Sequence, residues 1–511
     1  MRALRSLPLL LLGLLAGLGP APAGATSGWQ RKVEPALLAA VAHGSAEALI
    51  VLGEQADLTP AAALPTRAEK GRFVVARLQR TAREQQAGLL AELAARGIAH
   101  QPFWVANFVA ARLDAPALAA VAARDEVAAV ELSGRFSLPP APTETPPPLP
   151  ESPDGVEWGL AKVQAPAVWA LGIRGQGVVV GGQDTGYEWN HPALREQYRG
   201  WNGSSASHAF HWHDAIHAGG GSCGANSPEP CDDHGHGTHT AGTMVGDDGG
   251  TNQIGMAPAA RWIGCRNMNQ GYGTPATYSE CFQWFLAPTD LAGQHGDPAL
   301  APAVINNSWG CPPSEGCTYP EILRTVVENV RAAGIVVVAS AGNSGSSCAT
   351  VQDPPAIYAA AFTVGATDAN DTIAGFSSRG PVTVDGSGRL KPDIAAPGSS
   401  VRSAIRGGGY GTMSGTSMAG PHVAGLVALI LSAAPALDGR VETIERLIAR
   451  SAVPLGTSQL CHPDIPAGAV PNPTFGHGRI DALAAVAAAL DWIFEDGFEG
   501  GELPGGWVLG E

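Results

Sequence analysis

The stretch Gly411-Thr412-Met413-Ser414-Gly415-Thr416-Ser417-Met418-Ala419-Gly420-Pro421-His422 decides the interpretation of this chain, because it places a serine at the start of a predicted helix. Two other segments supply the partners that this serine would need as a nucleophile. Asp184 follows the apolar run at residues 178–182, and His236 opens a helix-like segment. A serine hydroxyl is a weak nucleophile at neutral pH, so an imidazole must take its proton and a carboxylate must orient that imidazole. The chain order Asp, His, Ser therefore predicts an activated serine.

Further apolar runs predict the sheet that carries these residues. Residues 303–305 and 335–338 have the pattern of buried parallel strands, and each run is followed by polar or glycine-rich residues. In doubly wound α/β sheets, functional residues gather beyond the carboxyl ends of the strands. Three residues occupy such positions: Asp184, Ser308 and Asn343. The sequence thus predicts an α/β fold with a doubly wound, mostly parallel sheet.

Four sequence blocks resemble the signature blocks of the subtilisin-like serine proteases, in the same order and with matching spacing. They are Asp184-Thr185-Gly186, His236-Gly237-Thr238-His239, Ala341-Gly342-Asn343 and Gly415-Thr416-Ser417-Met418-Ala419. The resemblance covers residues 155–490, roughly two thirds of the chain and one large catalytic domain. Within the family, Trp158-Gly159-Leu160 and residues 213–217 and 306–311 make the chain most similar to bacillopeptidase F-type enzymes.

The resemblance implies a role for each of these residues. Ser417 would be the nucleophile, His236 the general base and then acid, and Asp184 the orienting carboxylate. Asn343 would donate to the developing oxyanion together with the backbone N–H of Ser417. Two extended segments would pair with the substrate backbone as added strands; they are Ser308, Trp309, Gly310 and Ser340, Ala341, Gly342. Neither segment contains a carboxylate, so we expect apolar or aromatic residues before the cleaved bond, with broad tolerance.

Two other classes of protein stay open at this point. One is a catalytically silent binding protein with a subtilisin fold, because a fold alone does not guarantee function. The other is a zinc-dependent hydrolase that uses a dense group of histidines: His208, His211, His213, His217, His234, His236 and His239. The group contains no His-Glu-x-x-His pattern, which argues against the zinc enzyme.

The resemblance implies no required cofactor and leaves calcium open. The loop at residues 246–253 is rich in oxygen ligands and lies where many family members bind calcium. Ala193, which follows His191 and Pro192, stands where those members often carry an acidic ligand. We therefore interpret the loop as a solvated acidic turn.

The N-terminus and the cysteines predict export. Residues 1–25 combine Arg2 and Arg5, an apolar run and small residues, the pattern of a secretory signal peptide. No later stretch reaches the roughly 18 uninterrupted apolar residues of a membrane span. The even number of cysteines then suggests disulfides, with neighbours paired as Cys223 with Cys231, Cys265 with Cys281 and Cys311 with Cys317, which leaves Cys348 with Cys461.

Between the signal peptide and the catalytic domain, residues 26–138 have a pattern of their own. A strand, a helix, a strand, a short helix and a strand follow one another, which suits a small α+β ferredoxin-like module. The layout resembles the inhibitory propeptide of subtilisin-like proteases, and an accessory domain is the alternative. Residues 139–154 form a proline-rich linker suited to cleavage, and residues 491–511 form a short acidic C-terminal tail.

The charge of the chain excludes one large class of partner. The formal net charge is −15, and no basic stripe is present, so nucleic-acid binding is set aside. We expect a secreted monomer that is made as a self-processing zymogen, acts on protein or peptide substrates and has its own propeptide as inhibitor.

Overall fold

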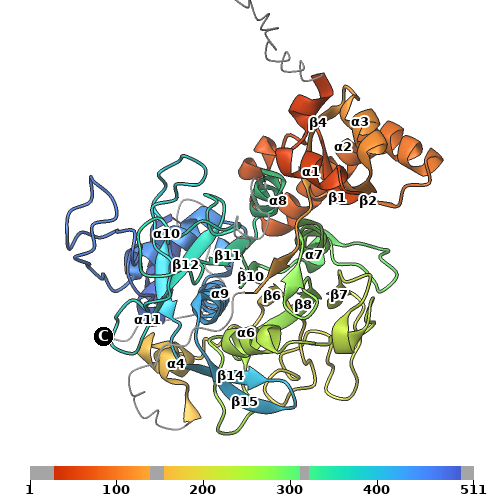
Figure 1. Ribbon diagram of the computed structural model, residues 1–511. Helices are drawn as coiled ribbons and strands as arrows, with labels where there is room; N and C mark the ends of the chain where they lie inside the picture. Colours follow the sequence, from red (N-terminus) through yellow and green to blue (C-terminus); the bar gives the residue numbers. More distant parts are fainter. Residues whose placement is uncertain (1–27, 139–154, 311–320, 497–511) are drawn as a thin grey trace, which may run out of the picture.

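The structure is a computed structural model that describes residues 28–138, 155–310 and 321–496. These residues form an N-terminal unit, up to residue 138, and a larger unit from residue 155 onward (Figure 1). The predicted signal peptide and linker lie outside the described residues, as do Cys311 and Cys317.

A seven-stranded parallel sheet forms the centre of the larger unit, in the order β13-β12-β11-β10-β6-β8-β7. The strands are β6 (Val179–Asp184), β7 (Trp212–Asp214), β8 (Arg261–Arg266), β10 (Val304–Asn307), β11 (Val336–Ser340), β12 (Phe362–Thr367) and β13 (Ile394–Pro397). The strand order reverses at β6, which lies between β8 and β10, and ligand sites in such sheets lie at this reversal. The α/β doubly wound fold is confirmed.

Helices cover both faces of this sheet (Figure 1). One face packs against α6 (His236–Val245), α9 (Thr416–Ala433), α10 (Val441–Ser451) and α11 (Ala482–Asp496), with α4 (Trp158–Lys162) and α5 (Ala165–Ala170) nearby. The other face packs against α7 (Pro275–Leu286) and α8 (Glu321–Ala332). Side chains of β11 alternate between the two cores: Val336 and Val338 point to the first, Val337 and Ala339 to the second.

Helix α9 runs through the middle of the larger unit. Within the described ranges it is the one helix long and apolar enough to cross a membrane, but 83% of that window is buried inside the protein. A hairpin of β14 (Val401–Ile405) and β15 (Gly409–Met413) leads into it. Short 3₁₀ helices lie at Gly28–Lys32, Thr59–Ala63, Gly221–Cys223, Pro298–Leu300 and Pro435–Leu437.

The N-terminal unit has the β-α-β-β-α-β order of a ferredoxin-like fold, as expected. Its antiparallel sheet has the order β2-β3-β1-β4, and its elements are α1 (Pro35–Val41), β1 (Ala46–Leu52), α2 (Arg67–Ala95), β2 (His100–Phe103), β3 (Phe108–Leu113), α3 (Ala115–Ala122) and β4 (Val127–Leu132). The sequence did not predict β2, because it is a four-residue edge strand that contains a proline. A capping box between Thr66 and Glu69 fixes the start of α2.

The N-terminal unit lies directly against α7 and α8 of the larger unit (Figure 1). The backbone N–H groups of Trp104 and Val105 donate to Gln283 Oε1 on α7, at 2.7 and 3.1 Å. Asn329 Nδ2 on α8 donates to the Val105 carbonyl at 2.7 Å. Phe103 joins the apolar cluster on this face of the sheet. Polar and apolar contacts thus hold the two units together.

After Leu138 the chain is described again at Gly155. Before this gap, β5 (Phe136–Ser137) leaves the N-terminal unit and pairs antiparallel with β9 (Tyr272–Gly273) of the larger unit. At the other end of the chain, α11 continues through residue 491, where a tail is expected to begin, and ends at Asp496. Trp492 of this helix packs against the core and under the Arg440 guanidinium.

Three of the four expected disulfides lie in the described residues and are confirmed. They join Cys223 to Cys231, Cys265 to Cys281 and Cys348 to Cys461. The last pair lies 113 residues apart in the sequence, against 8 for the first.

Loop length predicts unequal contributions of these disulfides to stability. In the chain-entropy view, removing the disulfide that closes the 113-residue loop lowers the free energy of unfolding by about 4–5 kcal/mol. Removing the disulfide that closes the 8-residue loop lowers it by about 2–3 kcal/mol. Urea unfolding of a Cys348→Ser/Cys461→Ser variant, with Cys223→Ser/Cys231→Ser as the matched control, measures both values. Equal losses, or a larger loss for the short loop, would contradict this expectation.

Candidate active site

Asp184 and His236 meet at the carboxyl edge of the sheet. Asp184 is the last residue of β6, and His236 is the first residue of α6. His236 Nδ1 lies 2.7 Å from Asp184 Oδ1, and the buried carboxylate also accepts from the Thr185 N–H at 2.7 Å and the Thr240 hydroxyl at 3.3 Å. These contacts fix the carboxylate, which in turn orients the imidazole ring.

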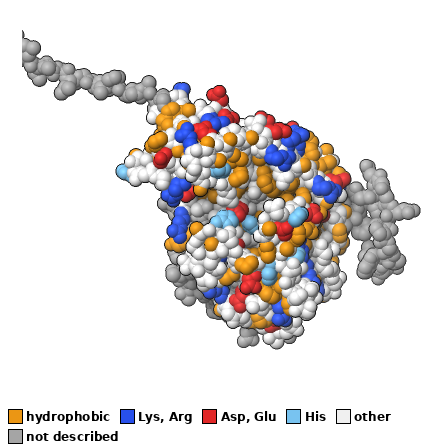
Figure 2. Space-filling view, turned by 90° about the vertical axis from the view of Figure 1, so that its right-hand side faces the viewer, with side chains coloured by type: hydrophobic (Ala, Val, Ile, Leu, Met, Phe, Trp, Pro, Cys, Tyr) orange, Lys and Arg blue, Asp and Glu red, His pale blue; other side chains and the backbone are white. Residues whose placement is uncertain are grey.

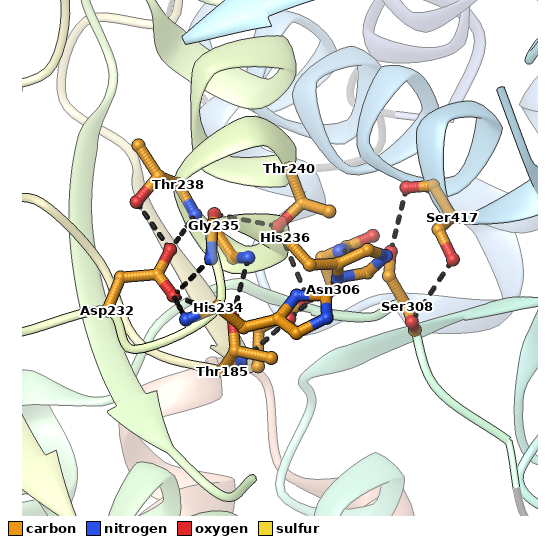
Figure 3. A network of polar contacts seen from close by, with 12 residues as sticks. Thr185, Asp232, His234, Gly235, His236, Thr238, Thr240, Asn306, Ser308 and Ser417 are labelled. Atoms are coloured by element: carbon orange, nitrogen blue, oxygen red, sulfur yellow. Dashed lines mark hydrogen bonds and ion pairs between the residues drawn. The ribbon is translucent and has the colours of Figure 1, made fainter. Parts of the chain in front are cut away.

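Asp232 organises the turn that carries His236 (Figure 3). Its Oδ1 accepts from the backbone N–H groups of His234 and Gly235, at 3.0 and 2.7 Å, and from the Thr185 hydroxyl at 2.9 Å. Its Oδ2 accepts from the N–H and hydroxyl of Thr238, at 3.0 and 2.6 Å. One buried side chain therefore satisfies five donors around the N-terminus of α6.

The electrostatic surroundings raise the pKa of His236 above its ordinary value. Burial of the ring favours the neutral form, but the charge of Asp184, the hydrogen bond to it and the charge of Asp232 outweigh burial. His236 is thus a stronger base than a free imidazole. It lies between the Asp232 turn on one side and Ser308 and Ser417 on the other (Figure 3).

Ser417 lies in the first turn of α9, and this turn is bound tightly to the ends of β10 and β11. The Ser308 hydroxyl donates to the Ser417 carbonyl at 3.0 Å, and the Ser340 hydroxyl donates to the Thr416 carbonyl at 2.9 Å. The Ser417 hydroxyl itself donates to the Ser308 carbonyl at 3.2 Å. In this arrangement the hydroxyl proton points to the Ser308 carbonyl, so donation to His236 would require the hydroxyl to reorient.

Asn343 contacts the same helical turn through its carbonyl oxygen. Asn343 Oδ1 accepts from the N–H and the hydroxyl of Thr416, both at 2.9 Å. The amide nitrogen of Asn343 is left as a donor beside Gly415, which adopts a positive φ of 154° before α9. The structure therefore places Asn343 against Thr416, the residue before Ser417, and its role as an oxyanion donor stays a prediction.

The two segments expected to bind substrate use their side chains inside the protein. The hydroxyls of Ser308 and Ser340 bind the start of α9, and the Trp309 ring stacks on Tyr278 with 3.7 Å between centroids. Trp309 is 3% exposed. Only the backbone of these segments can therefore take part in strand-like pairing.

A carboxylate that the sequence analysis missed lies beside both segments. A methyl group on Gly310 would lie 3.4 Å from Asp353 Oδ2, and one on Gly342 would lie 3.6 Å from the same oxygen. Asp353 follows Asn343 by ten residues, in the loop between β11 and β12. No sequence block marks it, because its proximity to Gly310 depends on how this loop folds back.

The sequence analysis also missed β9 as a neighbour of the site. Its Tyr272 and Gly273 pair with Ser137 and Phe136, and the Leu138 N–H donates to the Gly271 carbonyl at 2.8 Å. A methyl group on Gly271 would lie 3.4 Å from the His234 ring and 3.8 Å from Leu138. The chain therefore runs as an added strand toward the histidine pair His234 and His236.

The remaining histidines have separate partners. His213 and His217 both contact the Glu280 carboxylate, His208 contacts the Tyr198 hydroxyl, and buried His239 contacts the Val401 carbonyl. Burial, with the nearby His236 charge, lowers the pKa of His239 to about 3. Across residues 28–138, 155–310 and 321–496, no three His, Cys, Asp or Glu side chains gather in a way that could hold a metal ion.

The oxygen-rich loop at residues 246–253 does not fit calcium. Asp247 pairs with Arg174 at 3.0 Å, and Asn252 Oδ1 accepts from the Arg402 guanidinium. Asp248 accepts from the Asn252 amide at 2.6 Å and the Tyr410 hydroxyl at 3.2 Å. Donors and two guanidinium groups thus occupy the oxygens that a cation would need, in keeping with the interpretation of this loop as an acidic turn.

One edge of the parallel sheet carries a histidine that is hydrogen-bonded to a carboxylate, and a serine at the start of a helix lies at the same edge. This is the arrangement of a serine hydrolase. Residues 175–478 match the subtilase family. The chain therefore belongs to the subtilase family and is a subtilisin-like serine peptidase.

Individual relatives agree with this assignment. The chain is 41% identical over 349 residues to Bacillopeptidase F of Bacillus subtilis. The aligned region covers 66% of the chain and 22% of that protein. It is 33% identical over 331 residues to Subtilisin BL of Lederbergia lenta. Here the aligned region covers 65% of the chain and 98% of that protein. The chain thus spans under a quarter of the length of Bacillopeptidase F but nearly all of Subtilisin BL.

The contact network around Asp232 predicts a shift in the pH dependence of catalysis. A general base at His236 must be neutral to accept a proton, so on this expectation its raised pKa moves the acidic limb of the kcat/KM profile to higher pH. Replacing Asp232 with Asn removes one of the negative charges that raise this pKa and should move the limb to lower pH. The position of this limb is measured from kcat/KM for peptide hydrolysis between about pH 5 and pH 9.

Asp385→Asn is the matched control, because Asp385 accepts from Ser387 and Arg389 within its own turn. An unchanged or upward-shifted limb in Asp232→Asn would contradict this electrostatic role for Asp232.

Proposed function

We propose that the protein is a secreted serine endopeptidase that is made as a self-processing zymogen. The observation that carries the proposal is the 2.7 Å contact between Asp184 and His236, on the same sheet edge as Ser417. The predicted signal peptide, which lies outside the described residues, supports export.

The proposed reaction is acyl transfer through a seryl intermediate. Ser417 Oγ turns from the Ser308 carbonyl to His236 Nε2, gives up its proton and attacks the peptide carbonyl. The resulting oxyanion receives hydrogen bonds from Asn343 Nδ2 and the Ser417 N–H at the positive end of α9. His236 then protonates the leaving amine, and water repeats the sequence on the acyl-enzyme.

Asp184 would act in this reaction by orientation and charge. Its hydrogen bond to Nδ1 selects the tautomer that leaves Nε2 free to accept a proton, and it stabilises the imidazolium that forms. Asp232 adds negative charge at longer range and holds the turn before α6.

The N-terminal unit is proposed as the inhibitory propeptide. Its body is bound to α7 and α8, and residues 136–138 continue as a strand along β9 toward His234. An added strand in this place ends beside His234, two residues before the proposed general base, and would obstruct the approach of a substrate chain. Tethering of the strand to its own unit gives it a high effective concentration there.

The triad assignment predicts non-additive mutational losses. Ser417→Ala and His236→Ala should each abolish most turnover, and combining them should add little, because the residues act as one unit. A fluorophosphonate should label the wild type and fail to label Ser417→Ala. Losses that multiply in the double variant, or absence of wild-type labelling, would contradict the assignment and would favour a catalytically silent binding protein.

The zymogen assignment predicts that processing requires Ser417. The wild-type precursor should cut itself within or near residues 138–155, whereas Ser417→Ala should accumulate uncut, as N-terminal sequencing of both purified proteins would show. Separately purified residues 26–138 should inhibit the mature enzyme.

A Gln283→Ala variant of the mature enzyme is a useful comparison, because it removes the acceptor for Trp104 and Val105 and should weaken inhibition by the added unit. Normal processing of Ser417→Ala in a protease-free system, or no inhibition by the separate unit, would make residues 26–138 an accessory domain.

A further inference from the structure

Strand β9 turns its two side-chain positions to opposite sides. Gly273 is buried, whereas Tyr272 is 44% exposed. A methyl group on Gly271, the residue before Tyr272, would lie 3.4 Å from the His234 ring. The centre of that ring is 6.4 Å from the centre of the His236 ring. Tyr272 therefore presents an aromatic ring to solvent on the strand that leads to the proposed general base.

A cation from the N-terminal unit already covers this ring. The guanidinium carbon of Arg135 lies 4.4 Å from the centroid of the Tyr272 ring. In the part of the chain that the structure describes, no ion pair joins Arg135 to a carboxylate. A cation above an aromatic face is attracted by the negative face of the ring. The ring of Tyr272 is thus the group that this guanidinium contacts.

The register of β5 on β9 explains why Arg135 reaches the ring. Ser137 pairs with Tyr272, and Arg135, two residues earlier, has its side chain on the same face of the added strand. In an antiparallel pair, a side chain two residues from the directly opposite one stays within reach of an aromatic or long side chain. The contact follows from backbone pairing. Any chain that pairs with β9 in this register would therefore bring the same position over the ring.

We propose that a substrate chain pairs with β9 in place of β5, and that Tyr272 is then a subsite for an arginine or lysine side chain of the substrate. The inference rests on the peptidase function proposed for Ser417 and names a feature of its substrates. Arg135 lies three residues before Leu138, whose N–H donates to the Gly271 carbonyl. The favoured cation therefore belongs at least three residues before the residue at the cleaved bond.

The ring contact differs from general charge attraction in its dependence on position. The net charge of −15 attracts a cation at any position of a substrate. Figure 2 shows acidic side chains scattered over one face of the molecule, with basic ones among them, and not gathered in a single patch. The ring, in contrast, favours only positions on one face of the added strand. At an exposed site such a contact corresponds to about a 2- to 5-fold gain in binding.

The test uses the full chain after it has processed itself, with eight-residue peptide anilides whose anilide bond is the cleaved bond. One arginine is placed in turn at each of the five positions furthest from that bond, and a matched peptide carries citrulline, which has the shape of arginine without its charge. At the position equivalent to Arg135, kcat/KM for arginine should exceed that for citrulline by about 2- to 5-fold. The positions directly before and after it should show no advantage, because their side chains point to the opposite face.

Two substitutions of Tyr272 form a matched pair. Tyr272→Phe keeps the aromatic ring and should keep the wild-type ratio of arginine to citrulline peptide. Tyr272→Leu keeps an apolar side chain without a ring and should lower this ratio to about 1. The ratio is the measured quantity, so a change that affects both peptides equally does not alter it.

Three results overturn the proposal: an equal arginine advantage at all five positions, an advantage that persists in Tyr272→Leu, and no advantage at any position. If neither variant folds, the dependence on position in the wild type decides alone. Failure of the peptidase function is a different result, in which a fluorophosphonate does not label Ser417 and none of the peptides is cleaved, and the proposal then falls with that function.

Discussion

The first turn of α9 is bound to the carboxyl edge of the parallel sheet, and the whole site depends on this attachment. Hydroxyls at the ends of two adjacent strands donate to the carbonyls of Thr416 and Ser417, while Asn343 accepts from Thr416. The helix is buried along nearly its whole length, so it cannot shift without opening the core. A buried helix and a few short polar contacts together hold Ser417 at the same sheet edge as His236, which contacts a residue at the end of a different strand.

The sequence predicted those parts of the fold and site that rest on local chemistry. The sequence blocks that contain the four candidate site residues also contain glycines that close packing requires. At Gly237, for example, a methyl group would lie 2.1 Å from the Gly186 carbonyl. The four residues are Asp184, His236, Asn343 and Ser417. The apolar runs of β6, β10 and β11 were visible because strands buried on both faces are continuously hydrophobic. The roles of these residues remain predictions, whereas the fold and the family are confirmed.

Parts that depend on long-range contacts were not predictable. Asp353 stands in a proline-containing loop without a periodic pattern, and only the folded chain brings it to Gly310. Short strands such as β2 and β9 carry too few residues for a repeating pattern, and β9 forms only by pairing with β5 from the other unit. The acidic loop shows the same limit, because its arginine partners, Arg174 and Arg402, lie far away in the sequence.

The disulfide between Cys348 and Cys461 lies on the same loop as Asp353. Cys348 stands between Asn343 and Asp353, and its partner belongs to a segment that also touches this loop through Gln459, whose amide donates to the Ser346 carbonyl. The sheet and the histidine are held by other contacts, so a reduced chain would keep its overall architecture and lose a tether on this loop alone. Reduction of this one disulfide would therefore loosen the loop that follows Asn343 without undoing the sheet, so the oxidation state of two cysteines decides how firmly that loop is held beside the start of α9.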